Sequence, residues 1–571
     1  MERRWKIKEP GDSAVVEALA GELNVDKIVA NLLVQRGVDS FSSAKSFFRP
    51  SLDDLHDPFL MKDMDIAVDR LCKAIRSGER IMIYGDYDVD GTTAVALVFS
   101  FLRRYYQNLL FYIPDRYTEG YGISTKGIEA AADSGCSLII SLDCGIKAVN
   151  KIRYAKNFGI DFIVCDHHTP GEALPEALAC IDPKRQDDTY PYKDLSGCGV
   201  GFKLLQAFCL HNGYPVEPLY KYLDLVAVSI AADIVPITGE NRILAYYGLK
   251  QLNNDPGTGL KSIIHVSNME GKELEMSDVV FKIGPRINAA GRIESGRDAV
   301  ELLISGEEEL AKSLSANING HNEVRKDLDK KITDEALQLL INDPSQKERK
   351  STVLFRPHWH KGVIGIVASR LMDKFYRPTV IITESQGLAT GSARSVEGFD
   401  LYSAVESCSD LLISFGGHTS AAGLTMDIGN VELFAQRFEE WVEAHITPEQ
   451  MIPQVEIDAE IRLKDINARL MRLLAQFAPF GPANQKPLFV TRRVIDYGTT
   501  KLVGKGRDHI KFELIEECSG AIVRGIGFSM KDHLTKIQSR EPFDIVYSIE
   551  ENVYNGVSSV QLMIKDLLFP Y

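Results

Sequence analysis

Several features are missing from this sequence of 571 residues, and each absence narrows its class. No apolar stretch approaches the length of a membrane span, and none follows the charged N-terminal segment, so we expect neither a membrane helix nor a signal peptide. The nine cysteines are an odd number and include no CxxC pair. We therefore expect a reducing, cytoplasmic location, without a disulfide framework or a structural zinc site.

Motifs that bind nucleotide cofactors are also missing. Neither a GxGxxG nor a Walker sequence accompanies the predicted strands, which disfavours a dinucleotide-binding or P-loop protein. There is no internal repeat and no low-complexity tract. Hydrophobic residues make up 45% and charged residues 25% of the chain, a balance typical of globular proteins, and the length predicts three or four domains.

Negative charge is in excess, but it is unevenly distributed along the chain. The net charge is −14, yet residues 451–571 hold 16 Lys and Arg against 15 Asp and Glu. Local clusters of charge decide nucleic-acid binding more than the charge of the whole chain does. The composition therefore leaves a nucleic-acid partner open.

The first large unit is expected to be a doubly wound α/β domain over residues 61–300, after an N-terminal lead-in of residues 1–60. Short apolar runs such as "RIMIY", "LLFYIP", "SLIISL" and "DFIVC" alternate with amphipathic stretches. This alternation is typical of βαβ units whose parallel sheet is covered by helices on both faces.

Three further units are predicted. Apolar residues recur mostly at every fourth position from Glu307 to Asn342, with a gap in phase near Gly320, which indicates a long connecting helix within residues 301–345. Residues 346–447 repeat the strand and helix alternation and form a second, smaller α/β domain. Residues 448–571 contain short strands broken by Gly and Asn, which favours a small barrel or sandwich.

Polar side chains follow several of the predicted strands. Ligands of open α/β sheets bind outside the carboxyl ends of the strands, so these side chains are candidates for one site. Asp233 is added because it interrupts the apolar run "VSIAADIVP" and needs a partner. The complete set is Asp86, Asp88, Asp90, Asp143, Asp166, His167, His168 and Asp233.

Repulsion among these acids predicts bound cations. Two carboxylates about 5 Å apart repel by about 3 kcal/mol at an effective dielectric constant of about 20. Converging acids therefore need either raised pKa values or cations. Mixed carboxylate and imidazole ligands suit Mn²⁺ or Mg²⁺, so the sequence predicts a two-cation site. For any single aspartate, the alternative is a helix cap or a turn residue.

The candidate acids and histidines lie in four segments, "YGDYDVDG", "SLDCGI", "CDHH" and "AADIVP", which resemble the motifs of the DHH phosphoesterase family. The segments "FKIGPRINAAGRI", "WHKGVIGIVASR", "GSARSVEGFDL" and "FGGHTSAAG" follow in order, and the match covers most of the chain. Together they are similar to the branch of this family that degrades single-stranded DNA. Tyr84 stands where some family members have a histidine.

The resemblance implies which residues hold the ions. One or two Mn²⁺ or Mg²⁺ ions would be held by Asp86, Asp88, Asp90, Asp143, His167 and Asp233. Asp143 is the best candidate to bridge the ions, and the expected catalytic residues are His168, Asp143 and Asp90. His168 would hydrogen-bond the scissile phosphate or leaving group, or instead orient a ligand. Asp166 is expected to orient a histidine.

A second group is expected to bind phosphates of the substrate. By resemblance, Ser392 and Arg394, with Arg116, would form a pocket for a 5′-terminal phosphate, because arginine can clamp a phosphate by two hydrogen bonds. Tight turns are the alternative for the glycine clusters, and a surface ion pair is the alternative for Arg370. The full set is Arg116, Arg286, Asn288, Arg292, Arg370, Ser392, Arg394 and His418.

The C-terminal unit resembles the OB-fold that accompanies this family. Basic residues gather near Tyr497 and Phe512, which we expect to be exposed, and a basic groove with aromatic platforms binds single strands with little sequence preference. An ordinary solvated charged face is the alternative. The basic residues are Arg492, Arg493, Lys501, Lys505, Arg507 and Lys511.

The function expected from the resemblance is a metal-dependent exonuclease that hydrolyses single-stranded DNA from 5′ to 3′ to mononucleotides, in DNA repair and recombination. The resemblance also implies a monomer that cooperates with a single-strand-binding protein and a helicase. One alternative is a DHH phosphodiesterase for short oligonucleotides or cyclic dinucleotides. A non-catalytic replication scaffold is a third reading, which the complete ligand set disfavours.

Overall fold

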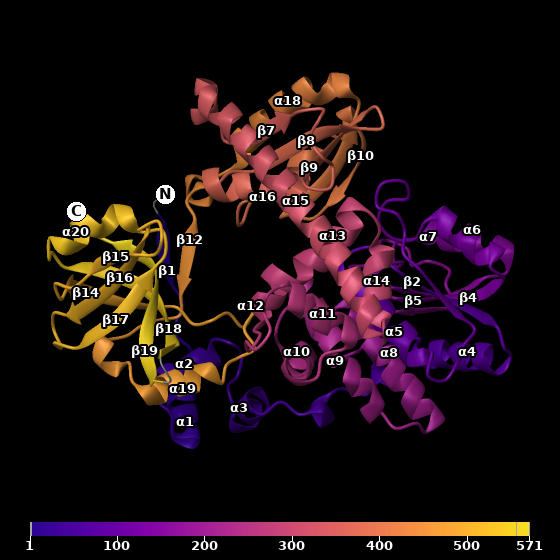
Figure 1. Ribbon diagram of the computed structural model, residues 1–571, viewed down its shortest axis with the longest axis horizontal. Coiled ribbons are helices and arrows are strands. Elements are labelled where there is room, and N and C mark those ends of the chain that lie inside the picture. The colour runs from indigo at the N-terminus through magenta and orange to yellow at the C-terminus, as the bar shows by residue number, and fades with distance from the viewer. Residues whose placement is uncertain (1–2, 555–556, 570–571) are drawn as a thin grey trace.

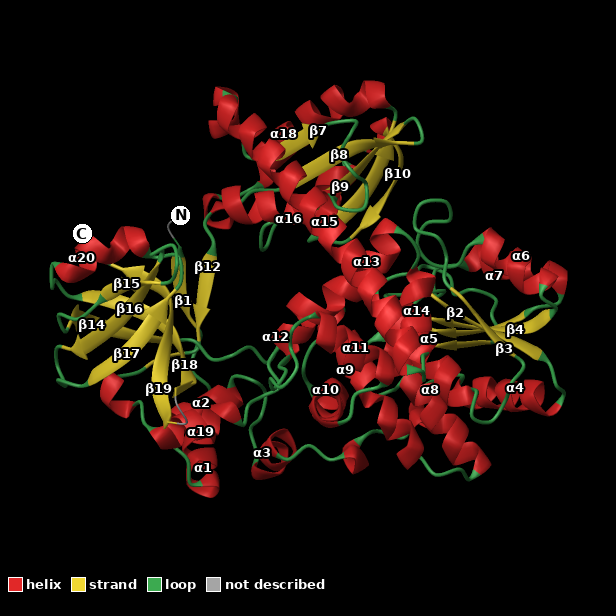
Figure 2. Cartoon of the chain, viewed as in Figure 1, coloured by secondary structure: helices red, strands yellow, loops and turns green. Residues whose placement is uncertain are grey.

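The computed structural model describes residues 3–554 and 557–569. Figure 1 shows a large α/β domain, a smaller α/β domain joined to it by one long helix, and a C-terminal β-rich domain. Figure 2 shows helices on the α/β parts and mostly strands in the C-terminal part. The predicted fold class is therefore confirmed, whereas the domain boundaries stay predictions.

The large domain is built on five parallel strands in the order β3-β2-β4-β5-β6. Alternate residues of β2 enter two different cores: Ile81 and Ile83 pack with α4, α5 and α8, whereas Met82 and Tyr84 pack with α6 and α7. The elements are β2 Arg80–Gly85, β3 Leu109–Tyr112, β4 Cys136–Leu142, β5 Asp161–Cys165, β6 Ala179–Ile181, α4 Met64–Arg76, α5 Val89–Leu102, α6 Thr125–Asp133, α7 Val149–Ala155 and α8 Gly197–Asn212.

A helical layer completes this domain and joins the first core. The expected apolar run around Asp233 is a buried helix, α9, and the glycine-rich segment "GPRINAAGR" is helix α13. The bounds are α9 Leu223–Ala232, α10 Gly239–Asn254, α11 Thr258–Val266, α12 Met276–Asp278, α13 Gly284–Ile293 and α14 Gly296–Ile304.

One continuous helix, α15 (Glu308–Asn342), leads to the second α/β domain. Its 35 residues correspond to about 52 Å. The helix continues without interruption through the predicted gap in phase near Gly320, and Gly320 itself faces open space. The helix packs its N-terminal half against α13 and its C-terminal half against α16.

The second α/β domain has a mixed sheet in the order β10-β11-β9-β8-β7. Helix α16 covers one face together with α15, and helices α17 and α18 cover the other. Arg370 lies inside α16. The bounds are β7 Thr352–Phe355, α16 Ile364–Phe375, β8 Thr379–Ser385, β9 Leu388–Arg394, α17 Leu401–Glu406, β10 Leu412–Gly417, β11 Ala421–Met426 and α18 Val431–His445.

The C-terminal domain is a barrel rather than a sandwich. Seven strands form one sheet, and an additional pairing between β14 and β16 closes it. The bounds are β13 Ala459–Glu460, α19 Ala468–Ala475, β14 Phe489–Asp496, β15 Lys501–Val503, β16 His509–Glu516, β17 Ile522–Gly527, α20 Leu534–Gln538, β18 Phe543–Tyr554 and β19 Val557–Leu568.

The N-terminal segment packs against this barrel, far from it in sequence. Strand β1 (Arg4–Ile7) pairs in parallel with β12 (Gln454–Ile457), and helices α1 (Ser13–Leu23) and α2 (Lys27–Val34) share its hydrophobic core (Figure 1). Helix α3 (Phe41–Phe48) leads on toward the large domain. No helix among residues 3–554 and 557–569 has the length and apolar character needed to cross a membrane.

Candidate metal centre and nucleic-acid path

The predicted acids and histidines converge at the carboxyl edge of the parallel sheet. In chain order the five parallel strands run 2-1-3-4-5 across this sheet, so the order in which strands are added reverses between β2 and β4. Crevices at such reversals are the usual ligand sites of open α/β folds. β2, β4 and β5 each end there, and helix α9 brings Asp233 to the same edge.

The three acids after β2 have different surroundings. Asp86 is fully buried, and its Oδ1 accepts a hydrogen bond from the Gly122 backbone N–H (3.1 Å). Asp88 is the N-cap of α5 and accepts from the Gly91 N–H (3.0 Å). Gly91 itself has no room for a side chain, because a Cβ would lie 2.5 Å from the Asp86 carbonyl oxygen.

Asp90 is held by the start of another helix. Its carboxylate accepts hydrogen bonds from the backbone N–H groups of Gly197 and Cys198, at the N-terminus of α8, at 2.7 Å each. The Ser229 hydroxyl donates a third bond, also at 2.7 Å. An acid at a helix N-terminus is stabilised by the helix dipole, so Asp90 stays in place despite its neighbours.

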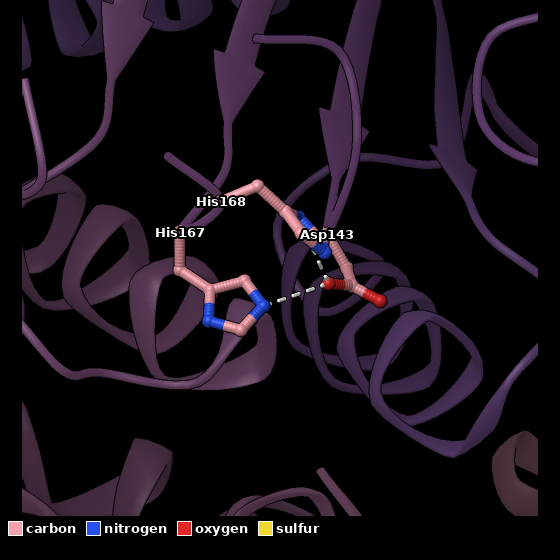
Figure 3. A group of neighbouring side chains, drawn as sticks. All are labelled: Asp143, His167 and His168. Carbon is pink, nitrogen blue, oxygen red and sulfur yellow. Dashed lines mark hydrogen bonds and ion pairs between the residues drawn. The ribbon is translucent and has the colours of Figure 1, made fainter. Parts of the chain in front are cut away.

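Asp143 lies against both histidines, as Figure 3 shows. Its Oδ1 is 3.1 Å from His167 Nε2 and 4.0 Å from His168 Nδ1. The residue is 2% exposed and adopts a left-handed backbone conformation with a φ of 58°. Aspartate tolerates this conformation better than most residues, and such strain is concentrated at functional sites.

Asp166 orients the histidine pair, as the sequence predicted. Its Oδ1 accepts hydrogen bonds from the backbone N–H of His167 (2.8 Å), the backbone N–H of His168 (3.1 Å) and His168 Nδ1 (2.7 Å). Its Oδ2 accepts from the Ile146 N–H (2.9 Å). These four bonds occupy the carboxylate, so Asp166 positions the histidines.

Two further acids, Asp233 and Asp90, approach His167. Asp233 is the C-cap of α9, and its Oδ2 lies 3.6 Å from His167 Nε2. Asp90 Oδ2 lies 3.7 Å from the same nitrogen. His167 is therefore approached by carboxylates from the segments that follow β2, β4 and α9.

The pKa values of the acids are shifted in different directions by their surroundings. Burial, reinforced by neighbouring carboxylates, raises the pKa of Asp86 and Asp143 well above the usual range and the pKa of Asp233 to about 8. Burial alone would also raise the pKa of Asp166, but its hydrogen bond from His168 lowers it to about 2.

The pKa values of the two histidines are also shifted in opposite directions. Burial lowers the pKa of His167, which keeps its imidazole neutral and able to act as a ligand. Burial also lowers the pKa of His168, but its hydrogen bond to Asp166 outweighs this and raises the pKa to about 9. His168 is therefore protonated at neutral pH, with its Nε2 3.2 Å from the Tyr121 hydroxyl.

The donor set fits divalent cations. Asp86 Oδ2 and Asp143 Oδ2 are buried and have no hydrogen-bond partner among the described residues, and His167 turns its Nε2 toward three carboxylates. Two groups of side chains, Asp143 with both histidines and Asp90 with His167 and Asp233, have ligand atoms close enough to share an ion. Buried carboxylates without partners are costly, and a hard divalent ion with oxygen and imidazole ligands removes that cost.

Arginines gather beside this centre, between the two α/β domains. Arg116 stacks on the Tyr87 ring at 4.2 Å and has a buried Nε without a partner among the described residues. Burial, followed by the nearby charges of Arg116, Arg325 and Arg394, lowers the pKa of Arg292 to about 10. So many cations facing one another indicate a site for anions.

Two side chains predicted to bind a terminal phosphate, Ser392 and Arg394, lie close together. Arg394 Nη1 donates to Ser392 Oγ (3.0 Å) on strand β9. The start of α16 lies against both, because a Cβ on Gly365 would be 3.0 Å from each side chain. Arg292 Nη1 donates to the Gly362 carbonyl (2.9 Å), which ties the large domain to this region.

Other predicted phosphate contacts have different surroundings. The Arg286 guanidinium is engaged by Asn319 and by the carbonyls of Lys282 and Val266. Arg370 pairs with Asp329 at 2.6 Å, and because Asp329 is fully buried this is not the surface ion pair considered as the alternative. Asn288 is half-buried on α13, and His418 is exposed at the turn between β10 and β11.

The basic residues of the barrel fall into two groups. Arg492 is paired with Asp544 (2.7 Å) and Arg493 with Glu517 (2.7 Å). The hairpin β15–β16 carries the other four, and Lys501 lies directly opposite Lys511 across its two strands. None of these four residues forms an ion pair with another described residue: they are Lys501, Lys505, Arg507 and Lys511.

One predicted aromatic platform is wrong. Phe512 is 1% exposed, because it alternates inward along β16 and fills the barrel core. Tyr497 is half exposed, as expected. Phe528, which is 52% exposed and lies edge-on to His509 at 4.9 Å, supplies an exposed aromatic near the hairpin that sequence patterns did not single out.

Sequence reasoning also missed Tyr121 and Arg325. The Tyr121 hydroxyl contacts both His168 and the Asp143 carbonyl oxygen. Arg325 projects from α15 toward Arg292 and has a buried Nε without a partner in the described part of the chain. Tyr121 stands in the segment "PDRYTEGYG", but Arg325 lies in an ordinary helical pattern that carries no signal.

Family models agree with this architecture. Residues 80–230 match the N-terminal domain of the DHH family, residues 348–444 match the DHHA1 domain, and residues 457–566 match the RecJ OB domain. The fold and the cluster of acids and histidines thus define a DHH-family phosphoesterase.

Curated relatives narrow the class further. The chain is 38% identical over 565 residues to the single-stranded-DNA-specific exonuclease RecJ of Bacillus subtilis, covering 99% of this chain and 70% of that protein. It is 33% identical to RecJ of Salmonella typhimurium over 99% of both chains. The chain therefore belongs to the RecJ family of single-stranded-DNA-specific exonucleases.

Solved structures give the same result. RecJ of Thermus thermophilus in complex with Mn²⁺ is 28% identical and superposes with a TM-score of 0.85, covering 100% of this chain and 80% of that chain. A structure of exonuclease RecJ bound to manganese is 33% identical, with a TM-score of 0.60 over 70% of this chain and 98% of that chain. These likenesses favour the exonuclease over the phosphodiesterase for short substrates.

Proposed function

We propose that this exonuclease uses two Mn²⁺ or Mg²⁺ ions held by the acids and His167 at the carboxyl edge of the parallel sheet. The observation that carries the proposal is the pair of buried carboxylate oxygens on Asp86 and Asp143 that have no partner among the described residues, beside His167 Nε2, which three carboxylates approach within 3.7 Å. The proposed ligands are Asp86, Asp88, Asp90, Asp143, His167 and Asp233. Bound there, such ions would supply the Lewis acidity that phosphodiester hydrolysis needs.

Residues of the chain would contribute three roles to the reaction. Asp143, which lies against both histidines, would bridge the ions. Asp90, anchored by the first N–H groups of α8, would hold its ligand position rigidly. His168 would keep a proton on Nδ1 through Asp166 and donate a hydrogen bond from Nε2 to an oxygen of the scissile phosphate or leaving group.

Polarity would come from the predicted phosphate pocket. A 5′-terminal phosphate would lie between Arg116, Ser392 and Arg394, close to Arg292 and Arg325, so that the first phosphodiester bond reaches the metal centre. This arrangement would give 5′ to 3′ digestion to mononucleotides, as used in DNA repair and recombination. The other side chains proposed along the phosphate path are Arg286, Asn288, Arg370 and His418.

The barrel would bind the strand that waits for digestion. The four cations of the β15–β16 hairpin, with Tyr497 and Phe528, would contact backbone and bases. A monomer that works with a single-strand-binding protein and a helicase follows from the family resemblance. Cytoplasmic location is supported by the nine free cysteines, eight of them buried.

Digestion of end-labelled strands tests the proposal. Single strands labelled at the 5′ or the 3′ end are incubated with Mn²⁺, beside a labelled duplex. We expect the 5′ label to appear at once as mononucleotide, the 3′ label to persist until late, the duplex to survive, and Asp143→Ala to be inactive. Early release of the 3′ label, or full activity of the variant, would contradict it.

A further inference from the structure

A second pocket lies in the large domain, away from the metal centre. It has a volume of about 530 Å³ and opens between the end of α5, the start of α9, the start of α11 and the loop after α14. Asp90 is in the first turn of α5, and Arg103 in the pocket wall follows its last turn. Thirteen residues of helix separate them, which corresponds to about 20 Å.

The floor of this pocket is apolar. Phe99 is 7%, Leu225 is 4% and Leu260 is 1% exposed, so their side chains are already packed and form a firm surface. The Tyr222 ring, which is half-buried, lines the same space. Mostly apolar walls with a few polar groups at fixed positions are typical of sites for small ligands.

The rim of the pocket is cationic. Arg103, Arg104 and Lys221 are exposed there, and none of them takes part in an ion pair found within residues 3–554 and 557–569. The first turn of α11 faces the same space, and just before it the Gly257 N–H donates to the buried carboxylate of Asp224 (2.8 Å), which also lines the pocket. Three exposed cations therefore gather at the rim, while the one acid of the wall is buried and hydrogen-bonded.

We propose that this pocket binds a nucleoside phosphate, whose phosphate lies among Arg103, Arg104 and Lys221 and whose base lies against Phe99 and Tyr222. Inorganic phosphate would leave the apolar floor uncovered, and a purely apolar ligand would gain nothing from three cations. A free nucleotide and the end of a strand share this chemistry. The proposal does not depend on which residues hold the metal ions.

The location makes this pocket a regulatory site. Helix α5 begins at the acids after β2 and ends in the pocket, whereas α9 begins in the pocket and ends at Asp233. The two helices pack against each other (Figure 1). A ligand that contacts Arg103 and Leu225 touches the far ends of both, so its binding is coupled to the positions of Asp90 and Asp233.

Equilibrium binding in EDTA tests the site without contribution from the metal centre. Binding of labelled dAMP and of a labelled 5′-phosphorylated trinucleotide to the full chain is measured beside inorganic phosphate. We expect saturable binding of dAMP, the trinucleotide or both, and the ligand that binds identifies the source. Arg103→Glu combined with Arg104→Glu should weaken it at least tenfold. Arg76→Glu, which reverses an exposed charge at the end of α4, should leave it unchanged.

Hydrolysis rates complete the test. With Mn²⁺ and a long single strand, the ligand that binds should change the rate of the wild type at least twofold. The double variant should keep the basal rate and lose this response, which separates the site from product inhibition at the metal centre. Absence of saturable binding in EDTA, equal binding by the double variant, or an equal rate response in both proteins would overturn the proposal.

Discussion

At the scale of single residues, the proposed metal centre buries several acids that would repel one another without cations. Asp86 and Asp143 each have a buried carboxylate oxygen without a partner among the described residues. Asp90, by contrast, has three hydrogen bonds, and Asp166 has four. The acids therefore divide into those that need an ion and those that hold the site in shape.

Asp143→Asn should separate stability from metal binding. In EDTA at pH 7.5 we expect the variant to be more stable than the wild type by about 1 kcal/mol, because the wild-type carboxyl, whose pKa is raised, must bury its charge or take up a proton on folding, whereas the amide does neither. Addition of Mn²⁺ to about 100 times its Kd should stabilise the wild type by about 2.7 kcal/mol and the variant far less. Thermal unfolding with and without Mn²⁺ measures both, and equal Mn²⁺ responses would contradict the assignment.

Asp166→Asn should damage the site without removing a ligand. Loss of the charged acceptor for His168 Nδ1 releases the orientation of the pair, and such changes cost about 10- to 100-fold in metal affinity or activity. Mn²⁺ titration and kcat on single strands are measured separately. Asp133→Asn, an exposed acid on α6, is the control and should match the wild type. Unchanged values for both variants would show that Asp166 does not position the histidines.

The sequence pointed to the candidate residues of this centre, but not to the groups that hydrogen-bond to them. Asp86, Asp143 and His167 follow apolar runs, and the ends of parallel strands necessarily meet at one edge. The hydrogen bonds from the start of α8 to Asp90 join residues that are more than 100 positions apart in the sequence, and no local sequence pattern predicts such a contact. Phe512 was misjudged for a related reason, since the inward face of a barrel strand depends on how the sheet closes.

At the scale of elements, the start of α8 lies unusually close to the metal centre. A Cβ on Gly197 would be 2.6 Å from the Asp143 Cβ, so only glycine lets the helix approach. The same approach places the N–H groups of Gly197 and Cys198 on Asp90. One glycine thus couples the position of a helix to two acids.

Gly197→Ala should therefore reduce activity while the domain stays folded. The added methyl group must displace α8 or Asp143, and misplacement of a catalytic group by about 1 Å can cost about 100-fold in rate. Initial rates with Mn²⁺ and circular dichroism are the measurements. Gly21→Ala is the matched control, because nothing lies within 4 Å of a Cβ there. A fully active Gly197→Ala would show that this close approach is not needed.

At the scale of the whole molecule, one buried arginine of the large domain contacts both the N-terminal segment and the segment between α19 and β14 of the C-terminal domain. Arg242 on α10 is 4% exposed, and its guanidinium donates to the Phe47 carbonyl (2.9 and 3.0 Å) and to the Phe477 carbonyl (2.8 Å). This contact could not be predicted, because it joins three distant parts of the chain. It fixes the barrel relative to the metal centre.

The β15–β16 hairpin should control the capture of long strands. Its four cations form no ion pairs with other described residues, so their replacement by glutamine removes free charge. For every phosphate that the strand no longer presents to a cation, the slope of log K against log salt should fall by about 0.7. Binding of a long strand is measured by salt titration. Replacement of Arg492 and Arg493, which are already paired, should have a smaller effect, and the reverse order would contradict this path.

The most direct test of the metal centre is anomalous diffraction from crystals soaked in MnCl₂. The account predicts anomalous peaks at the carboxyl edge of the parallel sheet, with Asp143 and His167 in contact with manganese and Asp86 Oδ2 no longer without a partner. An edge without manganese, with these carboxylates turned apart into solvent, would contradict the claim that the acids are buried to hold divalent ions.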